Sequence, residues 1–151
     1  MLKVDIHTHI IPDNLPDFTK KFGYEGFVRL DKKNKSEADM ILFNENFRTI
    51  NCNCWNPEVR LDEMKNTEID IQVISPIPIM FSYWAEAKDA LEQSKFINDF
   101  ISDICIKYPK KFIGLGTIPM QSIDYSLKEL ERCKKELNLQ GIEIGTNINN
   151  Q

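Results

Sequence analysis

Short apolar segments alternate with helical patterns along this chain, and this order most constrains its fold. Residues 3–9, 69–74 and 112–118 and a shorter stretch at 141–145 read as strands. The spacing of apolar residues predicts a helix over 86–108 and another around 124–137. Strands that alternate with helices form βαβ units with right-handed crossovers. The sequence therefore predicts an α/β fold with a parallel sheet.

Turn and capping residues predict where the remaining elements begin and end. Pro57 at a first helical turn predicts a short helix before the second strand, and Pro109 predicts the end of the long helix. Asp124 is the predicted N-cap of the last helix. Residues 13–47 are mixed in polarity and predict a long irregular insertion after the first strand, with one short hairpin.

Composition bounds the class of protein. The chain has 151 residues, of which 42% are apolar and 28% charged, so it should fold as one unit. Barrels usually need about 200 to 250 residues. The net charge is −4 with both signs interspersed, which argues against a nucleic-acid partner. No apolar run is long enough to span a membrane and no signal-peptide pattern is present, so we expect a cytoplasmic protein with no membrane contact.

Four cysteines are too few for a disulfide scaffold. Cys52 and Cys54 form a C-x-C pair, which is a weak metal or redox signal because no second Cys or His pair follows at zinc-finger spacing. We expect all four to be free thiols.

The two histidines of the chain, His7 and His9, both lie in the first strand. Alternate strand residues point to the same side, so both imidazoles can converge on one ion beyond the end of the strand. An arbitrary H-x-H pair is more often simply exposed. Here, however, the pair lies at the carboxyl end of a strand in a parallel α/β pattern, where such folds place their active sites. The sequence therefore predicts a metal site.

The segment DIHTHIIP at 5–12 resembles the first-strand motif of the amidohydrolase superfamily. Further segments narrow the resemblance to the aminocarboxymuconate-semialdehyde decarboxylase family. These segments, in chain order, are FGYEGFV, FR at 47–48, CWNPEVRLDEM, PIMFSYW, FIGLGTIPMQ, ERCKKEL and GIEIGT.

The resemblance implies a zinc enzyme on a TIM-like (β/α)₈ barrel that releases CO₂ from 2-amino-3-carboxymuconate 6-semialdehyde in the kynurenine branch of tryptophan catabolism. It implies that His7 and His9 are zinc ligands and that Arg48 binds a carboxylate of the substrate. A planar guanidinium suits that role because it can pair bidentately with a carboxylate.

Other residues have plainer readings. Bulky side chains after the second strand either wall a pocket over the metal or belong to the core, namely Met80, Phe81, Tyr83 and Trp84. We expect Trp55 to pack, and Asp5 to lie in the barrel interior or to orient a ligand. We do not expect Glu143 to be a ligand, because the resemblance implies an amide-type residue at that position.

The resemblance covers only about the first half of the family's length, or about four βα units. It implies that a third metal-binding histidine, an acid/base histidine and a metal-binding aspartate lie on later strands, so this chain should hold no catalytic acid/base. Half a barrel has two open sheet edges, so we expect a homodimer or association with another subunit. The alternative function is a non-catalytic truncated subunit that binds a full-length homologue.

Overall fold

The computed structural model describes residues 1–150. They form two sheets, a four-stranded parallel sheet of order β1-β5-β6-β7 and a three-stranded antiparallel sheet of order β2-β3-β4. The elements in chain order are β1 Val4–Ile10, α1 Phe18–Phe22, β2 Arg29–Lys32, β3 Glu37–Leu42, β4 Glu45–Asn51, the 3₁₀ turn η1 Cys52–Cys54, α2 Pro57–Asn66, β5 Ile71–Pro76, the 3₁₀ turn η2 Pro78–Met80, α3 Ala87–Lys107, β6 Phe112–Gly116, α4 Ile123–Lys135 and β7 Gly141–Ile142.

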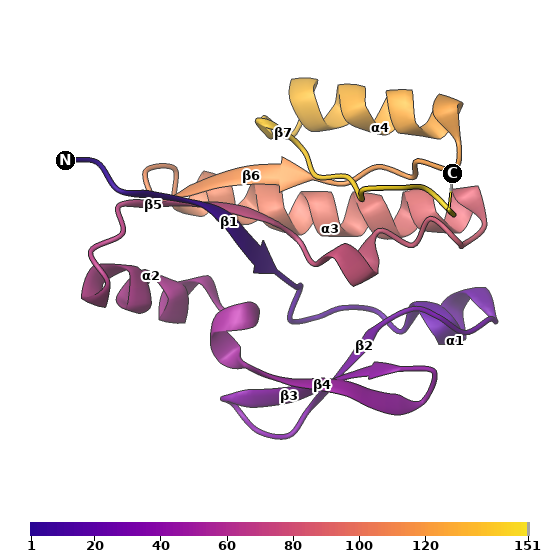
Figure 1. The fold of residues 1–151 in the computed structure, drawn as a ribbon, viewed down its shortest axis with the longest axis horizontal. Helices are drawn as coiled ribbons and strands as arrows, with labels where there is room; N and C mark the ends of the chain where they lie inside the picture. Colours follow the sequence, from indigo (N-terminus) through magenta and orange to yellow (C-terminus); the bar gives the residue numbers. More distant parts are fainter. Residues whose placement is uncertain (151) are drawn as a thin grey trace.

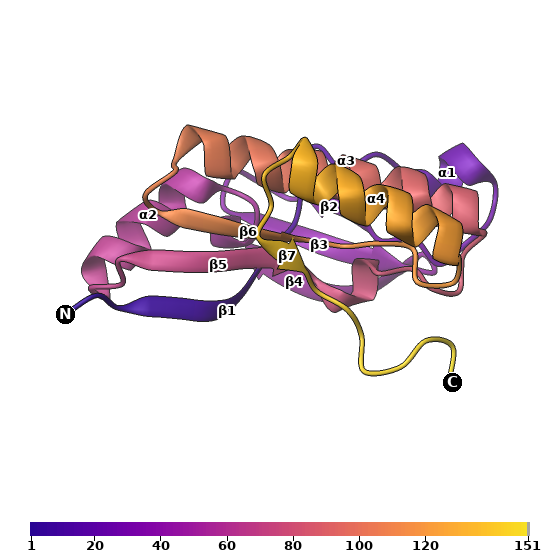
Figure 2. The same ribbon diagram turned by 90° about the horizontal axis from the view of Figure 1, so that it is seen from above.

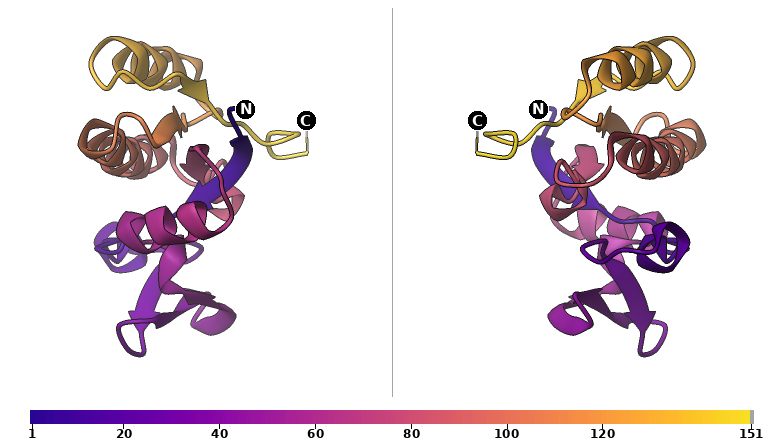
Figure 3. Two further views of the ribbon diagram at one scale, coloured as in Figure 1. Left: turned by 90° about the vertical axis from the view of Figure 1, so that its left-hand side faces the viewer. Right: turned by 90° about the vertical axis from the view of Figure 1, so that its right-hand side faces the viewer.

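The parallel sheet confirms the α/β prediction. Figure 3 shows α3 and α4 side by side on the same side of the parallel strands, with the small antiparallel sheet set apart beyond α2. Figure 2 shows β1 at one edge of the parallel sheet and β7 running beside β6. The carboxyl ends of the parallel strands therefore meet at one edge of the sheet, where the loops after β1, β5 and β7 gather (Figure 1).

The insertion after the first strand is more regular than the sequence predicted. Instead of an irregular segment with one hairpin, it contains α1 and all three antiparallel strands. Phe43 and Asn44, both at positive φ, form the turn between β3 and β4. Every residue of β4 except Ile50 is exposed or nearly so, and β2 is short and charged. These strands lack the apolar alternation from which a strand is recognised.

Several predicted boundaries were wrong in detail, including those of the second strand, β5, which runs over Ile71–Pro76 instead of 69–74. The last helix is capped by Ser122, whose hydroxyl accepts a hydrogen bond from the Tyr125 N–H, and Asp124 lies within the first turn. The first strand extends to Ile10, which is fully buried. The last strand ends at Ile142 instead of residue 145. Helix α2 begins as predicted, with Pro57 in its first turn and the Asn56 side chain accepting from two backbone N–H groups.

Helix α3 packs closely on β6 because Gly114 has no side chain. A Cβ at Gly114 would lie 2.6 Å from Leu139 and 2.8 Å from Ile101. Ile97 and Ile101 are fully buried in this layer. The core of the parallel sheet therefore lies between its strands and α3.

A buried polar network joins α3, α4 and the end of β6. The Asn98 amide donates to the Thr117 carbonyl and to Glu129, each at 2.8 Å, and its oxygen accepts from the Thr117 N–H at 2.8 Å. Arg132 forms an ion pair with Glu129 at 2.8 Å. Asn98 and Glu129 are almost fully buried, so each of their polar atoms depends on these partners.

A second anchor holds the insertion against α3. The Tyr24 hydroxyl donates to Asp89 at 2.8 Å and accepts from the Glu86 N–H at 3.2 Å. Desolvation, followed by the hydrogen bond to Asp89, raises the pKa of Tyr24 to about 12. The surrounding rings of Phe22, Phe27 and Trp84 lie with their centroids 5.3 to 6.5 Å from that of Tyr24.

The open edge of the sheet at β1 exposes apolar side chains. Val4 is 41% exposed and Ile6 is 75% exposed. These two residues match the expectation that half a barrel leaves an apolar surface without a neighbouring strand. None of the helices within residues 1–150 combines the length and the apolar character that a membrane span requires.

We predict that Asn98→Ala lowers the free energy of unfolding by about 1–3 kcal/mol, because the Thr117 N–H and Glu129 lose buried partners. Urea unfolding followed by circular dichroism measures the change. Asp103→Ala, on the exposed side of the same helix, is the control and should stay within about 0.5 kcal/mol of the parent. Equal effects of the two substitutions would refute the role of the network.

We predict an alkaline loss of stability that depends on Tyr24. Its pKa is about 12 in the folded chain and 10.0 for an ordinary tyrosine, so the folded state holds this proton more tightly. The resulting stabilisation is complete below pH 10 and disappears as the pH rises toward 12. Tyr24→Phe should cost about 0.5–1.5 kcal/mol at pH 7 and flatten this part of the pH profile. Urea unfolding at several pH values tests it, with Tyr125→Phe as the control that should keep the parent profile.

Candidate functional site

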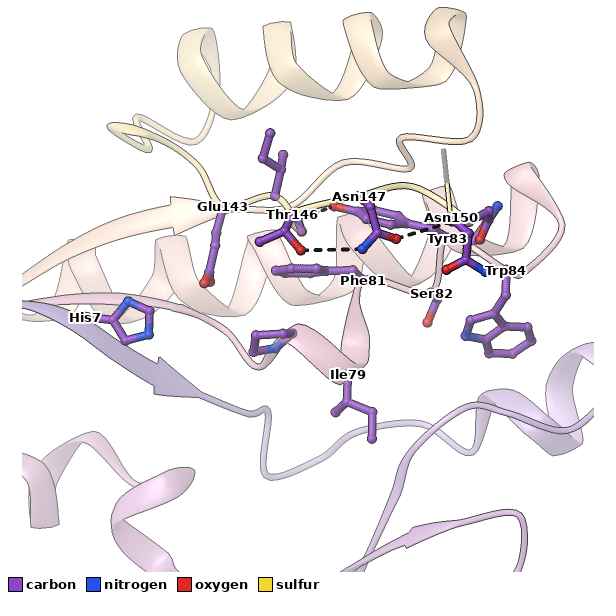
Figure 4. A pocket seen from close by; sticks show the side chains of 14 residues that line it. His7, Ile79, Phe81, Ser82, Tyr83, Trp84, Glu143, Thr146, Asn147 and Asn150 are labelled. Atoms are coloured by element: carbon purple, nitrogen blue, oxygen red, sulfur yellow. Dashed lines mark hydrogen bonds between the residues drawn. The ribbon is translucent and has the colours of Figure 1, made fainter.

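The two histidines and Glu143 meet at the carboxyl edge of the parallel sheet. His7 and His9 lie on β1 with their ring centroids 4.8 Å apart in an edge-on arrangement. Glu143 follows β7, at the far edge of the same sheet. One ligand atom from each of the three residues lies within 4.8 Å of the other two. Figure 4 shows Glu143 reaching down from the β7 segment into the space beside His7.

Strand β5 orients the His9 ring. The parallel register places His9 beside Ser75 and Ile10 beside Pro76. The Nδ1 atom of His9 lies 3.0 Å from the Pro76 carbonyl oxygen and 3.1 Å from the Ser75 hydroxyl. Because a carbonyl only accepts, Nδ1 carries the proton in this contact and Nε2 keeps its lone pair. This is the arrangement that a metal-ligating histidine uses.

A buried arginine supports the same turn of chain, and the sequence analysis did not identify it. Arg60 on α2 is 7% exposed, and its guanidinium donates to the His9 carbonyl at 2.6 Å and to the Asn53 carbonyl at 3.0 Å. Burial lowers the pKa of Arg60, while Cys54, Glu63 and Asp5 oppose that shift. Arg60 therefore ties α2 to the backbone of the metal-site strand. Its place in the motif CWNPEVRLDEM was the available signal.

The structure places Glu143 beside the two histidines, although the sequence analysis did not expect it to be a ligand. The Glu143 N–H donates to the Gly116 carbonyl at 2.8 Å, which extends the pairing with β6 beyond β7 and directs the side chain toward the histidines. Its Oε2 atom is buried, has no hydrogen-bond partner among the described residues and lies 3.6 Å from His9 Nδ1. Glu143 is the only carboxylate in the fourth strand pattern, but its approach to the histidines depends on the order of the strands in the sheet.

A cavity of about 790 Å³ adjoins His7 and Glu143. Phe81 and Tyr83 line it with stacked rings whose centroids are 5.6 Å apart, and burial raises the pKa of Tyr83. The segment after β7 forms the opposite wall, where the Gly145 N–H donates to the Tyr83 hydroxyl at 3.0 Å. The cavity is lined by His7, Pro78, Ile79, Phe81, Ser82, Tyr83, Trp84, Glu143, Ile144, Gly145, Thr146, Asn147, Asn149 and Asn150.

Of the bulky residues after the second strand, one belongs to the core and three line the cavity, so both interpretations from the sequence apply. Met80 is 1% exposed and belongs to the core, whereas Phe81, Tyr83 and Trp84 line the cavity. Trp84 can occupy its place because Gly26 has no side chain, since a Cβ there would lie 2.4 Å from the indole ring. Gly26 also has a φ of 113°, which a residue with a side chain rarely adopts.

The other predicted residues lie elsewhere. Arg48 is exposed on β4 and does not line the cavity, so the structure does not bring it together with the histidines. Asp5 accepts from the His7 N–H at 3.4 Å and lies outside the cluster. Trp55 packs in the core, as predicted. Cys52 and Cys54 are free and carry no metal-like grouping within residues 1–150.

The donors at this edge fit a divalent metal ion. Two imidazoles and a carboxylate are ligands that zinc accepts, and such sets occur in catalytic zinc sites that keep a fourth position open. The buried, unpartnered Glu143 Oε2 is the observation that most directly favours a cation here. The residues present are therefore compatible with the metal that the sequence predicted.

Comparison with known proteins identifies relatives of the whole chain. It is 47% identical over 148 residues to 2-amino-3-carboxymuconate-6-semialdehyde decarboxylase of Dictyostelium discoideum, covering 98% of this chain and 41% of the relative. It is 33% identical over 166 residues to the enzyme of the same name from Caenorhabditis elegans, covering 97% of this chain and 41% of the relative. No family model matches the chain.

Solved structures share the fold. An amidohydrolase from Staphylococcus aureus superposes with a TM-score of 0.69 at 19% identity, over 100% of this chain and 39% of the neighbour. A 5-carboxyvanillate decarboxylase from Novosphingobium aromaticivorans, complexed with manganese, superposes with a TM-score of 0.71 at 20% identity, over 99% of this chain and 43% of the neighbour. The architecture is thus part of a TIM-like barrel. Although it spans only 41% of the length of its curated relatives, the chain belongs to the 2-amino-3-carboxymuconate-6-semialdehyde decarboxylase family.

Proposed function

We propose that residues 1–151 form part of the barrel domain of a zinc-dependent decarboxylase, which releases CO₂ from 2-amino-3-carboxymuconate 6-semialdehyde in the cytoplasm, in the kynurenine branch of tryptophan catabolism. The observation that carries the proposal is the pair of His7 and His9 at the carboxyl edge of the sheet, beside a cavity that His7 lines. The 47% identity to a decarboxylase of that name supports the same substrate.

In this proposal His7 and His9 hold the zinc ion. The Pro76 carbonyl keeps the His9 ring in the tautomer that leaves Nε2 free, and Arg60 holds the backbone behind it. Bound zinc supplies Lewis-acid polarisation of a substrate oxygen. Phe81 and Tyr83 exclude water from one side of the cavity, which strengthens polar interactions within it.

Arg48 is proposed to bind a carboxylate of the substrate. Its guanidinium is exposed and forms no ion pair within the part of the chain that the structure describes, so its donors are available. The support for this role is the FR match at residues 47–48, together with the fork geometry of the guanidinium.

Decarboxylation breaks the bond between the carboxylate carbon and the substrate chain, and the electron pair left on carbon takes up a proton. Both histidines of this chain are assigned to the metal, so neither is free to deliver that proton. A second candidate function is that of a non-catalytic subunit that binds a full-length homologue. The exposed Val4 and Ile6 at the edge of β1 favour it, because they offer apolar surface to another strand.

We predict that the zinc-loaded chain binds the substrate saturably. His9→Ala and Arg48→Ala should each weaken this binding by about tenfold or more, because each variant loses one charged or metal contact. Equilibrium binding followed by substrate absorbance measures it. Arg29→Ala, on strand β2 of the same antiparallel sheet, is the matched control and should bind like the parent. Absence of saturable binding by the parent would overturn the proposal.

The same absorbance assay separates the two candidate functions. Loss of substrate with release of CO₂ above the no-protein level shows that the chain is catalytic by itself. Tight binding without CO₂ release, together with co-purification of a full-length homologue, shows the non-catalytic subunit.

A further inference from the structure

Glu143 faces the metal-site histidines at a position where the resemblance implies an amide. We propose that Glu143 is a third metal ligand, so that His7, His9 and Glu143 together bind a divalent cation of the zinc type with a position left open. This inference rests on the proposed function, because it completes the same site, and it adds a ligand that the sequence did not predict.

The distances permit three-way coordination. Zinc lies about 2.0–2.2 Å from nitrogen and carboxylate ligands, so two ligand atoms of one tetrahedral site are roughly 3.3–3.6 Å apart. The ligand atoms of His7, His9 and Glu143 all lie within 4.8 Å of one another. Side-chain rotations that shorten the widest permitted separation by roughly 1.3 Å therefore bring the three atoms into range.

The surroundings of Glu143 favour the binding of a cation, because no positively charged side chain of the cavity pairs with its carboxylate. The cavity that it lines contains no lysine or arginine, and its other potentially charged lining residue is His7. Glu143 Oε2 is buried and has no hydrogen-bond partner within residues 1–150. Its separation of 3.6 Å from His9 Nδ1 exceeds hydrogen-bond length, and that nitrogen already contacts the Pro76 carbonyl. A buried carboxylate oxygen without a partner is costly, and a metal ion between it and the imidazoles removes that cost.

The backbone holds Glu143 at the site independently of any ion. Its N–H is bonded to the Gly116 carbonyl at 2.8 Å, and two residues later the Gly145 N–H is bonded to the Tyr83 hydroxyl. The Glu143 carboxylate thus extends from the segment after β7 toward the histidines of β1. Hydrogen bonds at residues 143 and 145 fix the backbone of this segment. Placement on strands and fixed backbone is what a binding site needs for a defined ligand geometry.

The test is zinc binding by the metal-free chain, measured by competition with a chromogenic chelator. We expect the parent to bind one Zn²⁺, and Glu143→Gln to bind it about 10- to 100-fold more weakly, because the amide keeps the size of the side chain but not its charge. Glu45→Gln, on exposed strand β4, is the matched control and should bind like the parent. Mg²⁺ should not compete, because it prefers all-oxygen octahedral sites.

A second readout distinguishes ligation from a structural role. In the Co²⁺-loaded chain, Glu143→Gln should change the visible absorption of the metal, and Zn²⁺ should raise the melting temperature of the variant less than that of the parent. Unchanged zinc affinity and an unchanged cobalt spectrum in Glu143→Gln would overturn the proposal. An ion pair between Glu143 and His9 alone predicts that unchanged result.

These outcomes are separate from those of the proposed function. If His9→Ala abolishes zinc binding and Glu143→Gln does not alter it, Glu143 is not a ligand while the histidine site stands. If both substitutions weaken zinc binding but the chain binds no substrate, the three-ligand site stands and the proposed substrate does not. If the parent binds no zinc, the described residues do not form a metal site and the inference fails.

Discussion

The pairing of β1 with β5 is the constraint on which the rest of the site depends. It places His9 beside Ser75 and brings the Pro76 carbonyl to His9 Nδ1. The register shifts between Asp5 and Thr8, so the end of β1 does not follow the strict alternation of its beginning. Any change of register would carry His9 away from its carbonyl partner and from Glu143 together.

Support for this strand comes from outside the sheet. The guanidinium of Arg60 on α2 donates to the carbonyls of His9 and Asn53. These two hydrogen bonds join the end of β1 to the chain that follows the antiparallel sheet. Trp55 and Met64 are buried in the same core as Ile10. The insertion and α2 therefore stabilise the strand that carries the two histidines, in addition to β5.

Much of the fold followed from residue patterns, and the failures have physical reasons. Apolar patterning identified the parallel strands and α3. Helix α3 and strand β6 each bury one face, whereas Val4 and Ile6 of β1 are exposed. The antiparallel strands were missed because β4 is almost entirely exposed, and Arg29–Lys32 is charged and short. The cap of α4 was misplaced by two residues because Ser122 and Asp124 are both good capping residues, and only geometry decides between them.

In the candidate site, likewise, the residues that lie close together in the sequence could be predicted, and the residue brought in by tertiary contact could not. His7 and His9 could be recognised as a candidate metal site because both imidazoles lie on one strand, two residues apart. Glu143 is brought to them across β5 and β6, and no spacing along the chain records that distance. A ligand contributed by a distant strand becomes visible only when the sheet order is known. In this chain the sheet of order β1-β5-β6-β7 places Glu143, which follows the last strand, within 4.8 Å of ligand atoms of the histidines on the first strand, and this proximity is the basis for proposing it as a third donor.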